Sequence, residues 1–172
     1  MILITLVALG TMALADPGPL APARDGLVQC YEPNVEQKTC QSIASYRFET
    51  NGRILNKAET VLGDNPRIVL IAEAEVYVRD GAECSSESVS PDHILSVEVD
   101  GLALSGDDLA GISQVIATAI NEEVGEGEFC STYHHKPDGS MTALVTVSEQ
   151  PRADLSAVVR WVRREDGWRL EP

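Results

Sequence analysis

Several catalytic signatures are missing from this 172-residue sequence. It contains no Gly-x-Ser-x-Gly, no Gly-x-x-x-x-Gly-Lys-Ser/Thr loop and no Gly-x-Gly-x-x-Gly, which disfavours serine hydrolase chemistry on a nucleophile elbow and the use of nucleotides. No Cys-x-x-Cys pair occurs either, which disfavours thiol redox catalysis and a zinc site built on paired cysteines. We therefore expect no cofactor and no dedicated metal site.

Basic residues are scarce and unevenly placed. The chain has 13 Lys and Arg against 27 Asp and Glu, giving a net charge of −14 and a pI near 4.5. No Lys or Arg lies between Arg79 and Lys136. Repulsion from phosphates disfavours nucleic acid and anionic membrane surfaces as partners. The acidic stretch is typical of a face for a cationic partner or, more simply, of a solvated surface.

Long apolar runs are also missing beyond the start of the chain. Ile2 to Leu9 is apolar, and Ala13-Leu14-Ala15 has the small residues of a signal-peptidase site, although no Lys or Arg precedes the run. This stretch is shorter than the ~20 residues of a membrane-spanning helix. We expect a signal peptide over residues 1–15, a flexible Pro-, Ala- and Gly-rich arm over residues 16–26, and no membrane segment after cleavage.

Cysteines, in contrast, form an even set of four: Cys30, Cys40, Cys84 and Cys130. With the leader, they predict two disulfides and a periplasmic or secreted protein. Three pairings are available to four cysteines. The short loop from Cys30 to Cys40 favours Cys30–Cys40 with Cys84–Cys130, while the other two pairings stay open.

Residues 27–172 are expected to form a single disulfide-containing α+β domain. Apolar side chains alternate with Glu73, Glu75, Tyr77 and Arg79 over residues 68–79, which predicts a strand with one buried face. Asn51-Gly52 predicts a hairpin just before it. An apolar stripe at helical spacing predicts the main helix over residues ~106–123, with a capping box at its start and a stop at a glycine.

Four further strands are expected after the helix, over residues 129–136, 141–148, 155–161 and 168–170, as an antiparallel meander. The expected fold class is therefore α+β, with antiparallel meanders packed on one main helix. Tyr46 precedes Asn51-Gly52 by the same distance as Tyr133 precedes Asp138-Gly139. Either an internal duplication or the use of the same turn chemistry twice explains this repeated spacing.

The order strand, helix, four strands from Leu95 onward resembles cystatin-like and NTF2-like rolls. The closing segment from Trp161 to Arg169 is similar to the last hairpin of NTF2-like domains. This resemblance covers less than half of the chain. It implies a curved antiparallel sheet that wraps one helix in the C-terminal half, and it implies no activity.

Ionisable side chains offer three candidate sites. His134 and His135, with His93, could hold a metal, but neighbours on a strand point to opposite faces, which favours surface histidines. Residues 122–128 are rich in Glu and could bind calcium, but they lack EF-hand spacing and fit a solvated loop better. The preferred candidate partner surface is the strand face with Glu73, Glu75, Tyr77 and Arg79, although such a face is often merely exposed.

These features favour an exported, non-enzymatic protein that binds an unknown protein or small-molecule ligand. The alternatives are a small periplasmic hydrolase that uses a histidine with a carboxylate, and an envelope structural factor. A hydrolase should hold His93 or His134 against an acid in a concave pocket. A binding protein should show a groove or sheet face without such a pair.

Overall fold

The structure is a computed structural model that describes residues 18–86 and 88–171. The expected signal peptide, residues 1–15, lies outside the described residues. The strands are β1 Val28–Tyr31, β2 Thr39–Cys40, β3 Ser42–Phe48, β4 Ile54–Asp64, β5 Arg67–Arg79, β6 Ala82–Ser85, β7 Ile94–Val99, β8 Leu102–Ala103, β9 Phe129–His135, β10 Met141–Val147, β11 Gln150–Pro151, β12 Ala157–Val162 and β13 Arg169–Leu170. The helices are α1 Ala21–Arg24 and α2 Gly106–Val124, with short 3-10 helices η1 Pro91–His93, η2 Ala153–Leu155 and η3 Arg164–Asp166.

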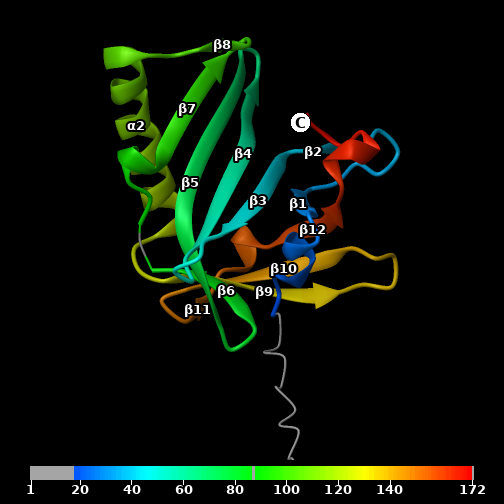
Figure 1. Cartoon of the computed structure of the whole chain (residues 1–172). Helices are drawn as coiled ribbons and strands as arrows, with labels where there is room; N and C mark the ends of the chain where they lie inside the picture. The colour runs from blue at the N-terminus through cyan, green and yellow to red at the C-terminus, as the bar shows by residue number, and fades with distance from the viewer. Residues whose placement is uncertain (1–17, 87, 172) are drawn as a thin grey trace, which may run out of the picture.

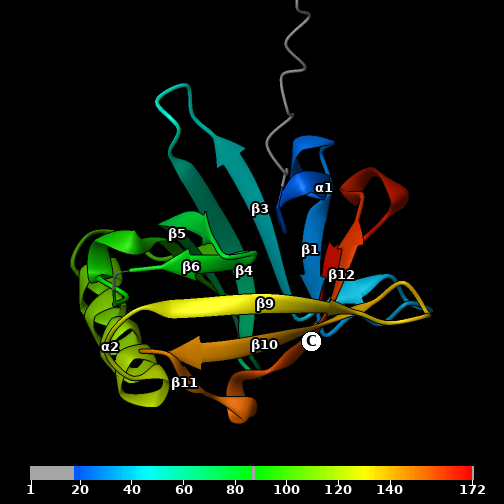
Figure 2. The same ribbon diagram turned by 90° about the horizontal axis from the view of Figure 1, so that it is seen from below.

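Eight antiparallel strands form a closed barrel in the order β4, β3, β1, β12, β10, β9, β6, β5, and β5 pairs back onto β4 (Figures 1 and 2). The protein is mostly β, so the expected α+β fold of meanders packed on a main helix, in cystatin-like or NTF2-like order, is wrong. The physical reason lies in two strands of four residues each, β1 and β6. The first joins β3 to β12, and the second joins β5 to β9. These two short strands close two separate meanders into one barrel.

The end of the chain also differs from the expected meander. Strand β13 pairs in parallel with β2 and not with β12. Outside the barrel wall, Cys30, Cys40, Ile43 and Val162 form a buried cluster onto which further apolar side chains pack: Val28, Trp168 and Leu170. Burial of the C-terminal apolar side chains on this disulfide-containing cluster holds the end of the chain against the wall of the barrel.

Two hairpin turns follow the turn chemistry of the sequence. Asp80 and Gly81 have φ of +51° and +79°, and Asp100 and Gly101 have φ of +52° and +80°. Positive φ at both central residues is the type I′ geometry, which matches the twist of the flanking strands and suits Asp-Gly. These turns reverse the chain after β5 and after β7. The predicted hairpin around Asn51-Gly52 is present between β3 and β4.

The main helix has nearly the expected limits. Ser105 is the N-cap residue, although its side chain makes no capping hydrogen bond, so the expected capping box is absent. Gly125 ends the helix with φ of +96°. The apolar stripe packs beyond the barrel on β7 and the first half of β5, around Leu70, Val97 and Ala117. Figure 1 shows α2 running beside β7 at this end of the sheet.

The two disulfides have the pairing favoured by loop length. Cys30–Cys40 links β1 to β2, and Cys84–Cys130 links the directly paired strands β6 and β9. Two disulfides indicate an oxidising environment. Within the described residues, every helix is too short or too polar to cross a membrane. The segment expected to be a flexible arm contains α1, and Leu20 at its start is 1% exposed.

Candidate functional site

The lumen of the barrel holds a buried polar cluster centred on Glu83, which is only 7% exposed. Side chains alternate along β6, so Glu83 points inward because Cys84 points outward to its disulfide with Cys130. The other members come from β1, β3, β4 and β9. We call the whole set the lumen cluster: Glu83, Gln29, Tyr31, Tyr46, Asn56 and Tyr133.

Neutral side chains provide all the hydrogen bonds that Glu83 makes within the cluster. The Tyr133 hydroxyl lies 2.6 Å from Glu83 Oε2, and Asn56 Nδ2 donates to Oε1 at 3.1 Å. The Tyr46 oxygen lies 3.0 Å from Oε1 and 2.8 Å from Oε2. Among the described residues, no Lys, Arg or His forms an ion pair with Glu83. This carboxyl is therefore buried without a counter-charge.

Gln29 is the second buried centre of the lumen cluster, with 0% exposure. Its Oε1 accepts hydrogen bonds from the Tyr31 hydroxyl at 2.9 Å and from the Tyr46 hydroxyl at 2.7 Å. Its Nε2 is buried and has no hydrogen-bond partner among the described residues. A buried amide nitrogen without an acceptor destabilises the folded state by about 1–3 kcal/mol. The lumen therefore keeps one unused donor.

With Gln29 Oε1 facing the hydroxyl of Tyr46, counting protons favours a neutral Glu83. Burial raises the pKa of Tyr46 and that of Tyr133 well above 10, so each phenol keeps its single proton. The Tyr46 oxygen contacts Gln29 Oε1 and both Glu83 oxygens, and one proton cannot serve this many acceptors. A protonated Glu83 solves this conflict because it donates to Tyr46, which then donates to Gln29. The observed distances fit a neutral carboxyl.

The environment of Glu83 agrees with this assignment. Burial raises the pKa of the Glu83 carboxyl above its ordinary value of 4.5. Hydrogen bonds from Tyr133, Tyr46 and Asn56 act in the opposite direction, since they stabilise the carboxylate. The net direction is upward because desolvation is the largest contribution. A neutral carboxyl is the form that a low-dielectric barrel interior favours.

Three cavities share the side chain of Asn56 in their lining. The largest has a volume of about 550 Å³ and lies between β1, β3, β4 and β12, where Tyr31 and the exposed Glu32 line it. A cavity of about 150 Å³ is lined by Glu83 together with the aromatic residues Tyr31, Phe129 and Tyr133. The third, of about 330 Å³, lies between the barrel and α2. The lumen cluster therefore borders open space on one side, while Tyr31 and Tyr133 also pack against the buried side chains of Met141, Ala143 and Val159.

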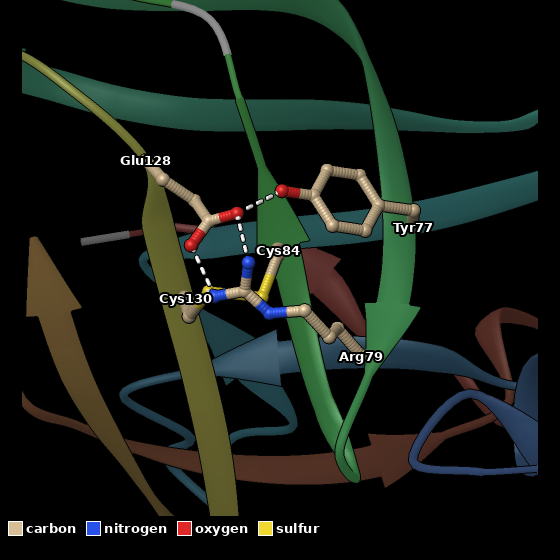
Figure 3. Close-up of a disulfide and its surroundings, with 5 residues drawn as sticks. All are labelled: Tyr77, Arg79, Cys84, Glu128 and Cys130. Atoms are coloured by element: carbon tan, nitrogen blue, oxygen red, sulfur yellow. Dashed lines mark hydrogen bonds and ion pairs between the residues drawn. A yellow bond between two sulfur atoms is a disulfide. The ribbon is translucent and has the colours of Figure 1, made fainter. Parts of the chain in front are cut away.

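The predicted partner surface lies on the outer face of the barrel and is engaged within the protein. Arg47 lies 3.5 Å from a Glu73 oxygen, and Arg53 Nε lies 2.8 Å from Glu75 Oε2. Farther along β5, Tyr77 and Arg79 both bind Glu128 beside the Cys84–Cys130 disulfide (Figure 3). The structure thus divides the four residues into two groups. One group pairs with Arg47 on β3 and with Arg53 just before β4, and the other pairs with Glu128 just before β9.

Among the described residues, the histidines make no hydrogen bond to the lumen cluster, although His93 lines a cavity that Asn56 also lines. His134 and His135 are exposed on β9, and His93 lines the cavity beside α2. The described residues that line this cavity with His93 include no Asp or Glu. One group within the described residues has metal-ligand spacing, formed by Cys84, Glu128 and Cys130. Its two sulfur atoms are bonded to each other, so they are not available as thiolate ligands.

Sequence reasoning missed the lumen cluster. In the sequence, Glu83 was considered only as part of the net charge. Tyr46 and Tyr133 were noted only because each precedes a predicted turn by the same number of residues. One usable signal was the position of Glu83 directly before Cys84. A cysteine that pairs on the outer face of a strand places its neighbour in the interior.

Comparisons with protein-family models, with curated proteins and with solved structures give no match to this chain. The function must therefore be argued from the lumen itself.

Proposed function

We propose that this protein is exported to the periplasm or outside the cell and binds a small molecule, without catalysis, in the lumen of its barrel. The observation that carries the proposal is the buried lumen cluster beside preformed cavities of about 550 and 150 Å³. Binding sites for small molecules are concave spaces of roughly 300–1,000 Å³ with a few placed polar groups. The larger cavity falls within this range, and the lumen cluster supplies the polar groups.

A small hydrolase has weaker support. Acid–base chemistry would need a histidine within hydrogen-bond reach of a carboxyl. Among the described residues, Glu83 receives its hydrogen bonds from phenols and an amide. His134 is exposed, and it lies on a strand whose inward positions include Ser131 and Tyr133. The side chains that line the lumen suit the binding of a ligand by shape and hydrogen bonds better than they suit catalysis.

The two disulfides support the exported location, because such bonds persist in oxidising compartments. The net charge of −14 keeps the protein soluble and makes nucleic acid an unsuitable partner. Expression with its own leader, followed by mass spectrometry of the exported protein, should show cleavage after Ala15. An intact Met1 on exported protein would contradict the expected signal peptide.

Filling the lumen provides the test of the binding function. Ala58 lines both the 550 Å³ cavity and the cavity beside α2, so Ala58→Phe should occupy their shared space. Ala110 is exposed on α2, so Ala110→Phe adds the same ring outside the barrel. A thermal-shift screen against small metabolites of several chemical classes should find compounds that raise Tm by roughly 5–10 °C at 100 Kd. These compounds should stabilise the wild type and Ala110→Phe but not Ala58→Phe.

The outcome that contradicts the proposal is equally definite. Compounds that stabilise Ala58→Phe as strongly as the wild type bind outside the 550 Å³ cavity and outside the cavity beside α2. A screen in which no compound separates Ala58→Phe from Ala110→Phe means that these two cavities are not binding sites.

A further inference from the structure

The inner cavity of the barrel has an acidic and aromatic lining without a positive charge. Glu83 contributes the carboxyl, and Tyr31, Phe129 and Tyr133 contribute aromatic rings. None of the described residues that line this cavity or the 550 Å³ cavity is Lys, Arg or His. The volume of about 150 Å³ is that of about five water molecules at ~30 Å³ each. A short alkyl or arylalkyl group with a charged end fits this space.

Carboxylates and aromatic faces together recognise organic cations. An ammonium group pairs with a carboxylate through charge-assisted hydrogen bonds, and ring faces attract the same positive charge. Exposed Glu32, which lines the larger cavity, has the same sign. The net charge of −14 also raises the local concentration of cations around the protein. An anionic ligand would meet repulsion from Glu32 and from this net charge.

Gln29 gives the lumen cluster a second arrangement that suits ionised Glu83. When Glu83 loses its proton, Tyr46 must turn its own proton to the carboxylate, and Gln29 Oε1 loses that donor. A half-turn of the Gln29 amide presents Nε2, which has no partner in the neutral arrangement, to the Tyr46 oxygen. The unused donor then acquires an acceptor. The network can therefore accommodate both charge states of Glu83 without moving the backbone.

From this lining and this network, we infer that the lumen binds a small organic ammonium ion whose nitrogen pairs with the carboxylate of Glu83. This inference rests on the proposed function and names the class of ligand. The binding step balances as Glu83–COOH plus R–NH₃⁺ giving Glu83–COO⁻ paired with R–NH₃⁺, with one proton released to solvent. Tyr46 and Tyr133 then donate to the carboxylate, and the ammonium supplies the missing counter-charge.

Titration calorimetry with defined probes tests this inference. Butylammonium and phenethylammonium chlorides are compared with their neutral counterparts, 1-butanol and 2-phenylethanol, at pH 5. Each titration is repeated in two buffers of different ionisation enthalpy to count released protons. We expect at least one ammonium probe to bind the wild type at least about 30-fold more tightly than its alcohol, which is about 2 kcal/mol at 1.4 kcal/mol per tenfold. Binding should release protons from Glu83, and the number released should fall as the pH rises through the folded pKa.

Variants separate Glu83 from the general acidity of the chain. Glu83→Gln should weaken binding of the ammonium probe at least 30-fold and abolish proton release, while it keeps a hydrogen-bonding side chain of similar size. Glu75→Gln removes one carboxylate from the outer face of the same barrel and should change Kd by less than about twofold. A thermal melt establishes that Glu83→Gln is folded. If it is not folded, the wild-type comparison of ammonium and alcohol with its proton count decides the question.

Each contrary outcome is informative. Alcohols that bind as tightly as the ammonium probes overturn the cation inference and leave the lumen-binding function standing. Failure of both ammonium probes to bind, while other compounds separate Ala58→Phe from Ala110→Phe, has the same meaning. Failure of the Ala58→Phe test together with failure of both ammonium probes overturns the proposed function itself.

Discussion

The charge state of Glu83 predicts an unusual dependence of stability on pH. Its pKa is raised in the folded protein, so above pH 4.5 the unfolded chain loses this proton first. The stability that the neutral network contributes is complete below the unfolded pKa. It is lost as the pH rises through the folded pKa, because the buried carboxyl must then ionise without a counter-charge. The slope between the two pKa values is about 1.4 kcal/mol per pH unit for one proton.

Replacing Glu83 with Gln removes this ionisation and keeps a neutral side chain that donates and accepts hydrogen bonds. The free energy of unfolding of Glu83→Gln should therefore rise relative to wild type by about 1.4 kcal/mol for each pH unit above 4.5, until the folded pKa is passed. This gain corresponds to roughly 3–6 °C in Tm per pH unit for a chain of this size. Urea unfolding of both proteins at half-unit steps from pH 4 to 8 measures it directly.

A control with the opposite sign strengthens this test. Hydrogen bonds from Ser140 lower the pKa of the Asp138 carboxyl, so the contribution of Asp138 is present above its unfolded value of 3.8 and is lost as the pH falls through its folded pKa. Asp138→Asn should be less stable than the wild type at neutral pH and nearly as stable in acid. Glu83→Gln should instead become more stable relative to the wild type as the pH rises toward neutral. A difference between Glu83→Gln and wild type that stays flat or shrinks as the pH rises would refute the neutral assignment of Glu83.

Two further predictions concern the outer wall of the barrel. In the chain-entropy relation, removing Cys84–Cys130, which closes a loop of 46 residues, should lower the free energy of unfolding by about 4 kcal/mol. Removing Cys30–Cys40, which closes a loop of 10 residues, should lower it by about 3 kcal/mol. Urea unfolding of the two double-Ala variants measures both losses, and the reverse order would contradict the relation. A hydrogen bond from Tyr77, followed by Arg79, lowers the pKa of Glu128, so its stabilisation is present above pH 4.5 and is lost as the pH falls through the lowered pKa. Glu128→Gln should therefore be less stable than wild type at neutral pH and nearly equal in strong acid, as melts over this range would show.

Local patterns predicted the longer elements because those elements depend on local chemistry. The period-two alternation over residues 68–79 and the apolar stripe of α2 each bury one face, so the sequence records them directly. The turns at Asp80-Gly81 and Asp100-Gly101 have positive φ at both residues, and the turn at Asn51-Gly52 has it at Gly52, as these residue types tolerate. Loop length likewise favoured the observed disulfide pairing. Each of these features needs only neighbours along the chain.

Closure of the barrel could not be predicted in the same way. Strands β1 and β6 have only four residues each, so an alternation of apolar and polar side chains in them is too short to be diagnostic. They pair with strands that are distant in sequence: β1 with β12 and β6 with β9. A short strand whose partners on both edges are supplied by the rest of the fold needs little intrinsic preference of its own. The two meanders could therefore be predicted from the sequence, but their joining into one closed barrel could not.

The same two short strands carry Gln29 and Glu83, and this explains why the candidate site escaped the sequence. A polar residue on a strand is normally assigned to the solvent face, but here both side chains point into the barrel. An interior made only of apolar groups would need no such network. A carboxyl without a counter-charge and an amide nitrogen without an acceptor reduce the stability of the free protein. An ammonium ion would relieve both defects, so the features that weaken this lumen as a core are those on which we base the proposed cation site.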